Sequence, residues 1–149
     1  FRQAIPLLEK ALEDVFLTER YLAESNLGWA LFQVGEEEKG LTHVKNAIAQ
    51  NDKYCIGYQY LGLMYQKRKD FDRAIEQFRQ VLELCPAYPQ GRRDLGKALL
   101  MAGKAKEGCK ALKDCIKRSG MSEIGQECRR LFDLSCTGLE IGDKKDPGR

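Results

Sequence analysis

The residues of this sequence that could carry chemistry are six cysteines and a single histidine, His43. An enzyme needs an acid, a base or a nucleophile that converge in one pocket, and one isolated histidine does not supply such a group. The phosphate-binding patterns G-x-x-x-x-G-K-[ST] and G-x-G-x-x-G are also absent from the sequence. We therefore expect a protein that is not an enzyme and binds no cofactor, with His43 at a surface or boundary position.

The cysteines allow three interpretations: disulfides, small buried core residues, or a zinc site made by four of them. Zinc sites usually contain a close C-x₂₋₄-C pair. The distal cysteines are instead spaced by six residues, Cys109 to Cys115, and by eight, Cys128 to Cys136. We therefore predict no metal site, and the choice between disulfides and free thiols depends on which elements hold the cysteines.

Those elements are indicated by a repeated Leu-Gly pair. The pair occurs at Leu27-Gly28, Leu61-Gly62 and Leu95-Gly96, with 34 residues between successive copies. Glycine lowers the stability of a helix by about 1 kcal/mol relative to alanine, so its recurrence needs a reason. Two helices that cross closely provide one, because a larger side chain would force them apart.

A period of 34 residues is typical of tetratricopeptide repeats, which are helical hairpins. With Leu-Gly at positions 7 and 8, residues 55–88 place Ala74 at position 20, Phe78 at 24 and Pro86 at 32, which is nearly the whole pattern. Residues 21–54 and 89–121 match it more loosely. We predict an all-α superhelix of antiparallel hairpins.

The rest of the chain is assigned around these three repeats. Residues 1–13 fit the second helix of a truncated repeat, which a longer connection joins to residue 21. Residues 122–136 fit a capping helix, and 137–149 have the composition of a tail. We expect Leu139 and Ile141 of the tail to pack back on the last helices.

Hairpin geometry pairs all six cysteines. In an antiparallel hairpin, facing residues lie at similar distances from the turn, and their Cα atoms are about 5–6 Å apart, within disulfide range. Turns near Asp70 and Gly120 give the pairs Cys55–Cys85, Cys109–Cys136 and Cys115–Cys128. Such bridges would indicate an oxidising compartment, whereas free cysteines would be small core residues.

The first helices of stacked hairpins line a concave face suited to peptide or helix recognition. Trp29 and Tyr60 are the predicted anchors of a partner, and Arg93 with Lys97 are expected to pair with its acidic groups. The alternative for Trp29 is a place in the core. The predicted groove residues are Asn26, Trp29, Phe32, Gln59, Tyr60, Leu63, Lys67, Arg93, Lys97 and Met101.

The charge distribution excludes some partners. The 25 basic and 22 acidic residues leave a net charge of +3, and no block of five or six like charges occurs in the sequence. We therefore expect neither nucleic-acid binding nor a polybasic membrane patch. No apolar stretch is long enough to span a membrane. Because the chain begins without Met inside a helical pattern, we expect it to be a fragment whose targeting segment is missing.

The stretch DVFLTERYLAESNLGWALFQVGEEEKGLTHVKNAI resembles the tetratricopeptide lipoproteins of type IV pilus biogenesis, the secretin pilotins. The likeness lies in the long connection before the helix that carries Glu19-Arg20 through Asn26-Leu27-Gly28. The resemblance implies a protein on the periplasmic face of the bacterial outer membrane, held by a lipid anchor outside this chain. It also implies that secretin subunits are the partner and that their assembly is aided. The alternative is a cytosolic scaffold of another multiprotein assembly, with reduced cysteines.

Overall fold

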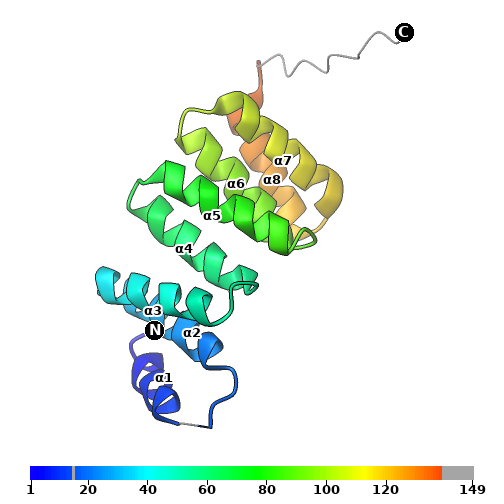
Figure 1. Ribbon diagram of the computed structural model, residues 1–149. Coiled ribbons are helices and arrows are strands. Elements are labelled where there is room, and N and C mark those ends of the chain that lie inside the picture. The colour runs from blue at the N-terminus through cyan, green and yellow to red at the C-terminus, as the bar shows by residue number, and fades with distance from the viewer. Residues whose placement is uncertain (15, 139–149) are drawn as a thin grey trace.

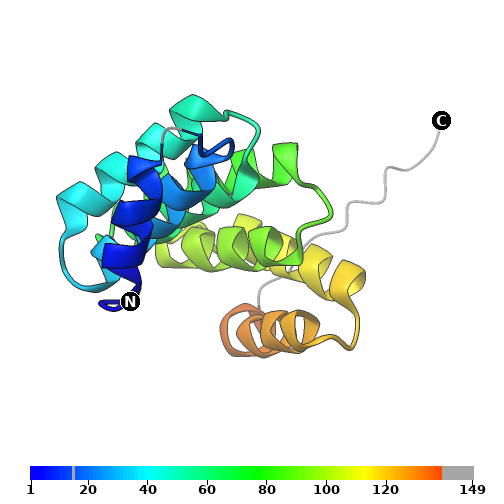
Figure 2. The ribbon, with the colours of Figure 1, turned by 90° about the horizontal axis from the view of Figure 1, so that it is seen from below.

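The computed structural model describes residues 1–14 and 16–138, and their regular structure is entirely helical (Figures 1 and 2). This confirms the predicted all-α fold. The elements follow one another with short turns between them. They are α1 (Ala4–Glu13), α2 (Arg20–Gln33), α3 (Glu37–Gln50), α4 (Cys55–Lys67), α5 (Phe71–Leu84), α6 (Pro89–Met101), α7 (Ala105–Ser119) and α8 (Glu123–Cys136).

The helices form a stack of antiparallel hairpins, α2 with α3, α4 with α5, and α6 with α7, and α8 packs on the last pair (Figure 1). Each hairpin turn ends with the same backbone hydrogen bond, for example from the amide of Glu36 to the carbonyl oxygen of Leu31 at 2.9 Å. The connection from α1 to α2 is longer than these turns, as the sequence predicts. None of the helices in the described part of the chain is long and apolar enough to cross a membrane.

The glycines at the helix crossings have a direct steric cause. A Cβ atom built on Gly28 would lie 2.7 Å from the carbonyl oxygen of Gly40, and one built on Gly40 would lie 2.6 Å from the carbonyl oxygen of Gly28. In the next hairpin, a Cβ atom on Gly62 would lie 2.6 Å from the ring of Phe78. These distances are shorter than Cβ atoms tolerate, so the close crossing explains the repeated glycine.

The core is divided between the middle of the stack and its C-terminal end. The larger cluster includes Phe32, Val44, Met64 and Phe78, whose side chains are fully buried. The second cluster is built around Leu112 and four buried cysteines, and it joins α7 to α8. The C-terminal helices are therefore held together largely by sulfur-containing side chains.

All six cysteines form the predicted disulfides. Cys55–Cys85 closes the α4–α5 hairpin, with Cα atoms 6.2 Å apart. The other two, Cys109–Cys136 at 5.8 Å and Cys115–Cys128 at 6.2 Å between Cα atoms, tie α8 to α7. Free cysteines are absent, and no group of metal-ligating side chains occurs among the described residues.

The capping helix α8 begins at a conventional N-cap, where the Ser122 hydroxyl accepts a hydrogen bond from the Gly125 amide at 3.2 Å. Its inner face carries Ile124, Cys128 and Phe132 toward the second cluster. The predicted contacts of Leu139 and Ile141 lie outside the described residues.

The steric role of Gly28 can be tested against a matched glycine. Gly28→Ala should lower the free energy of unfolding by about 2–3 kcal/mol, because the new methyl group meets a main-chain oxygen that cannot move alone. Gly57→Ala should change it by less than about 1 kcal/mol, because its new methyl group meets the flexible side chain of Ile48 at 3.0 Å. Urea denaturation of both variants measures the difference, and equal losses would contradict the crossing argument.

The disulfides should supply much of the stability of the C-terminal helices. Cys109→Ala combined with Cys136→Ala should lower the free energy of unfolding by about 3–4 kcal/mol, as expected for a bridge that closes a loop of this length. Thiol alkylation followed by mass spectrometry checks the bridges themselves. No cysteine should be alkylated before reduction, and all six should be alkylated after it. An unchanged melting temperature in reductant would rule out a stabilising role.

Candidate partner-binding surface

Two aromatic rings from successive first helices lie side by side among the predicted groove residues. Trp29 of α2 and Tyr60 of α4 stack with their ring centroids 4.9 Å apart and their planes 12° from parallel. Both side chains are half-buried and pack against the larger core cluster. One part of the Trp29 surface therefore packs on the core, and another part remains accessible.

The predicted groove residues differ in their accessibility. Asn26, Lys67, Lys97 and Met101 are exposed, and Leu63 is half-buried against the core. The structure corrects the prediction for Phe32, whose side chain is 0% exposed and belongs to the core. Phe32 is buried because the neighbouring hairpin covers it. The Lys67 ammonium lies over its ring, 5.1 Å from the centroid.

A chain of polar side chains crosses the first helices. The Gln59 amide donates to the carboxylate of Asp94 at 2.6 Å, and Arg93 donates to Asp94 at 2.8 Å and to Glu127 of α8 at 3.0 Å. Burial raises the pKa of Asp94 above its ordinary value, and the contacts with Arg93 and Gln59 oppose that shift. The chain thus links three helices, α4, α6 and α8.

This polar chain changes the expected charge of the groove. Arg93 is mostly buried and its guanidinium already pairs with two carboxylates, so it does not present a free charge to an acidic partner. Gln59, only 5% exposed, is likewise occupied by Asp94. The predictions that Arg93 pairs with acidic groups of a partner and that Gln59 lines the groove are therefore corrected. Lys97 remains exposed and has no ion-pair partner within residues 1–14 and 16–138.

Two tyrosines that the sequence analysis missed lie beside this site. Tyr54 and Tyr88 end successive repeats, 34 residues apart, directly before the first helices α4 and α6. Burial raises the pKa of both hydroxyls, and the nearby charge of Asp94 raises that of Tyr88 further. Their shared spacing is the signal that could have identified them.

His43 contacts a buried carboxylate of the neighbouring helix. Its Nδ1 atom lies 2.6 Å from a carboxylate oxygen of Glu24, a buried residue of α2. The contact joins the two helices of the first hairpin. Among the described residues, no nucleophilic side chain contacts the pair of His43 and Glu24.

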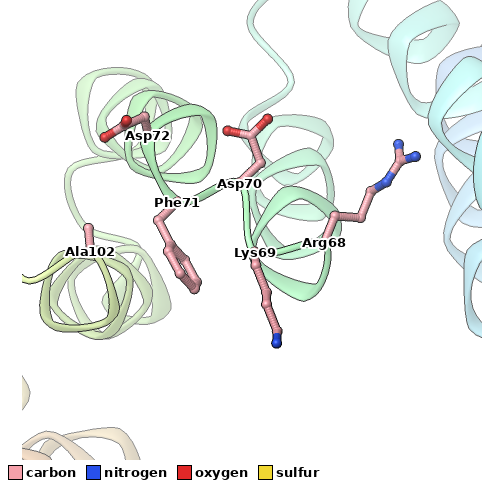
Figure 3. A pocket seen from close by; sticks show the side chains of 6 residues that line it. All are labelled: Arg68, Lys69, Asp70, Phe71, Asp72 and Ala102. Carbon is pink, nitrogen blue, oxygen red and sulfur yellow. The ribbon is translucent and has the colours of Figure 1, made fainter.

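The pocket shown in Figure 3 lies at the rim of the stack, beside the α4–α5 turn, and has a volume of about 430 Å³. Its charged residues are largely used within the protein: Arg68 pairs with Glu37 and Glu38, and Asp72 pairs with Lys104. In Figure 3 the Lys69 and Phe71 side chains extend in the same direction, whereas Arg68 points away from them. These ion pairs connect the α4–α5 turn to the repeats on either side of it.

Lys69 has an unusual backbone conformation. Its φ angle is +62°, and the equivalent positions of the neighbouring repeats hold glycines, Gly35 at +97° and Gly103 at +76°. Left-handed backbone costs a residue with a side chain about 1 kcal/mol or more. The α4–α5 turn is therefore strained where the other two are not.

Comparison with known proteins agrees with the geometry of the middle hairpin. The family model described as tetratricopeptide repeat matches residues 55–88, the same residues that the sequence pattern assigns to one repeat. Residues 55–88 are a tetratricopeptide repeat. No curated protein matches the sequence.

Solved structures with a similar fold include several of MamA. Two share 28% sequence identity with this chain at a TM-score of 0.70, cover 78% and 79% of it, and are themselves covered over 67% and 63% of their length. A third, MamA of AMB-1, has 23% identity and a TM-score of 0.70, with 90% of this chain and 70% of that chain covered. The chain thus spans about two thirds of these structures. The repeat and the shared fold support a protein–protein interaction module.

Relief of the strained turn gives a prediction about stability. Lys69→Gly should raise the free energy of unfolding by about 1 kcal/mol, because glycine adopts a positive φ angle without the side-chain clash. The reciprocal change, Gly103→Lys, should lower it by about the same amount. Thermal and urea unfolding measure both effects, and a Lys69→Gly variant that is less stable than the parent would contradict the assignment of strain.

Proposed function

We propose that this protein is a non-enzymatic interaction module that binds a segment of a partner protein along the face formed by α2, α4 and α6. The observation that carries the proposal is the stacked pair of Trp29 and Tyr60, at 4.9 Å between centroids. Large aromatic side chains that are fixed by packing and partly accessible are typical binding anchors, because little side-chain entropy remains to be lost.

The charges around the anchors indicate the character of the bound segment. Arg93 is neutralised by Asp94 and Glu127, so the cationic groups left on this face are Lys67 and Lys97. A segment with an apolar side chain for the aromatic pair and an acidic group near Lys97 would complement this surface.

We further propose a pilotin-like role, in which the partner is a secretin subunit and binding aids its assembly at the outer membrane. The resemblance of residues 14–48 to secretin pilotins supports this role. The three disulfides support a periplasmic location, because such bonds persist in oxidising compartments. A cytosolic scaffold is the second candidate, and its cysteines would be reduced in the cell.

Alanine substitutions at the anchors test the binding face. Trp29→Ala and Tyr60→Ala should each weaken binding to purified secretin by about 2 kcal/mol or more, measured by calorimetry or interferometry. Tyr58→Ala is the matched control, because Tyr58 is a half-buried tyrosine of the same helix outside the predicted groove. Unchanged affinity together with a lower melting temperature would show that Trp29 and Tyr60 act only in the core.

The partner itself requires a separate experiment. If the pilotin proposal is right, the mature protein should capture secretin from membranes of its source, and cells that lack it should accumulate unassembled secretin. Capture of another protein through the same two aromatic residues would reject the secretin but keep the binding face.

A further inference from the structure

The outer surfaces of α5 and α7 carry opposite charges at equivalent repeat positions. At positions 18, 22 and 29, α5 presents the acidic residues Asp72, Glu76 and Glu83, which we call the acidic stripe. The same positions of α7 present Lys106, Lys110 and Lys117, the basic stripe. All six side chains are exposed. In the first repeat these positions hold no such set, since they are Glu38, Thr42 and Ala49.

The three residues of each stripe lie along one narrow side of their helix. Residues four and eleven positions apart fall within an arc of about 40° on a helix, and the line extends for about 16 Å. Both lines lie opposite the buried faces, which contain Ile75 and Phe78 in α5 and Leu112 and Cys115 in α7. The charges are therefore presented outward.

Most of these charges are not neutralised within the molecule. Glu76, Glu83 and the three lysines have no ion-pair partner in the described residues, and only Asp72 has one, Lys104 at 3.4 Å. Position 25 lies between positions 22 and 29 on the same side of each helix. It holds Arg79 in α5 and Lys113 in α7. Arg79 pairs with Glu107, and Lys113 makes an interaction of its own.

A groove with an apolar floor lies between the two stripes. It has a volume of about 400 Å³, and Leu82 of α5, Leu95 and Leu99 of α6 and Ala111 of α7 line it. The ion pair between Arg79 of α5 and Glu107 of α7, at 3.1 Å, joins the two walls of the groove. The surface as a whole has an acidic side, an apolar centre and a basic side.

We propose that this surface, formed by α5 and α7 around the groove, binds a second copy of the same chain. A two-fold axis that runs along the groove, parallel to the helices, places α5 of each copy over α7 of the other. Because the stripes occupy the same repeat positions, this symmetry sets Asp72 against Lys106, Glu76 against Lys110, and Glu83 against Lys117 of the second copy. Every pair then occurs twice, as an isologous interface requires.

Charge complementarity also selects the orientation. A two-fold axis across the helices would place α5 over α5 and α7 over α7, which sets like charges against each other. The axis along the groove pairs opposite charges at positions 18, 22 and 29 and brings the two apolar floors together. The interface uses second helices, so the face with Trp29 and Tyr60 stays open for a protein partner.

The direct test is sedimentation of the 17.0 kDa chain at low and high salt. A dimer of about twice that mass should form at low salt and weaken as salt screens the pairs. Lys110→Glu with Lys117→Glu should raise the dimer dissociation constant about tenfold or more, because four attractive contacts become repulsive. Glu76→Lys with Glu83→Lys should do the same. Lys45→Glu with Lys53→Glu, which changes the net charge equally at exposed sites elsewhere, should have little effect.

Exchange of the charges makes the test specific. The variant with all four stripe substitutions should dimerise again, because each pair regains opposite signs. A mixture of the two double variants should form the heterodimer. A monomer at all concentrations, a dimer insensitive to these substitutions, or polymers in place of a dimer would each overturn the proposal. If the chain is monomeric, flotation with phosphatidylglycerol vesicles would show whether the basic stripe binds an anionic bilayer instead.

Discussion

The carbonyl oxygens of Gly28 and Gly40 each lie where the side chain of the other residue would begin. This contact between two main chains sets the spacing of α2 and α3, and the spacing determines which side chains reach the core. Phe32 and Val44 are fully buried beside it. The cost of glycine in a helix is offset because the close crossing improves packing over the whole hairpin.

The C-terminal end of the stack is stabilised in a different way. A terminal helix has a neighbour on one side only, so it buries less apolar surface than a helix inside the stack. In α8 only Gly125, Cys128 and Cys136 are buried, and both cysteines are bonded to α7. Covalent links thus compensate for a small interface. Of the inner hairpins, α2–α3 contains no cysteine, and α4–α5 carries the single bridge Cys55–Cys85.

The sequence alone was sufficient to predict features that follow from residue spacing within one hairpin. The 34-residue period predicted the helices, and distance from each turn predicted all three cysteine pairs. It was not sufficient for features that depend on a third helix. Phe32 was placed in the groove because its repeat position normally faces it, but the next hairpin buries the ring. Arg93 was predicted to be available to a partner, but in the structure it donates a hydrogen bond to Glu127 of α8. The partner-binding role of the groove stays a prediction.

The outer charges show why a linear search for charge blocks is insufficient. No block of five or six like charges occurs in the sequence, and the net charge of +3 suggests an even surface. Residues spaced by four and seven positions nevertheless meet on one side of a helix, so α7 collects lysines that the sequence separates with Ala111, Leu112 and Cys115. The 34-residue repeat then places these lysines at the positions that α5 fills with carboxylates. The fold therefore converts a nearly neutral sequence into a surface with two separate charged sides.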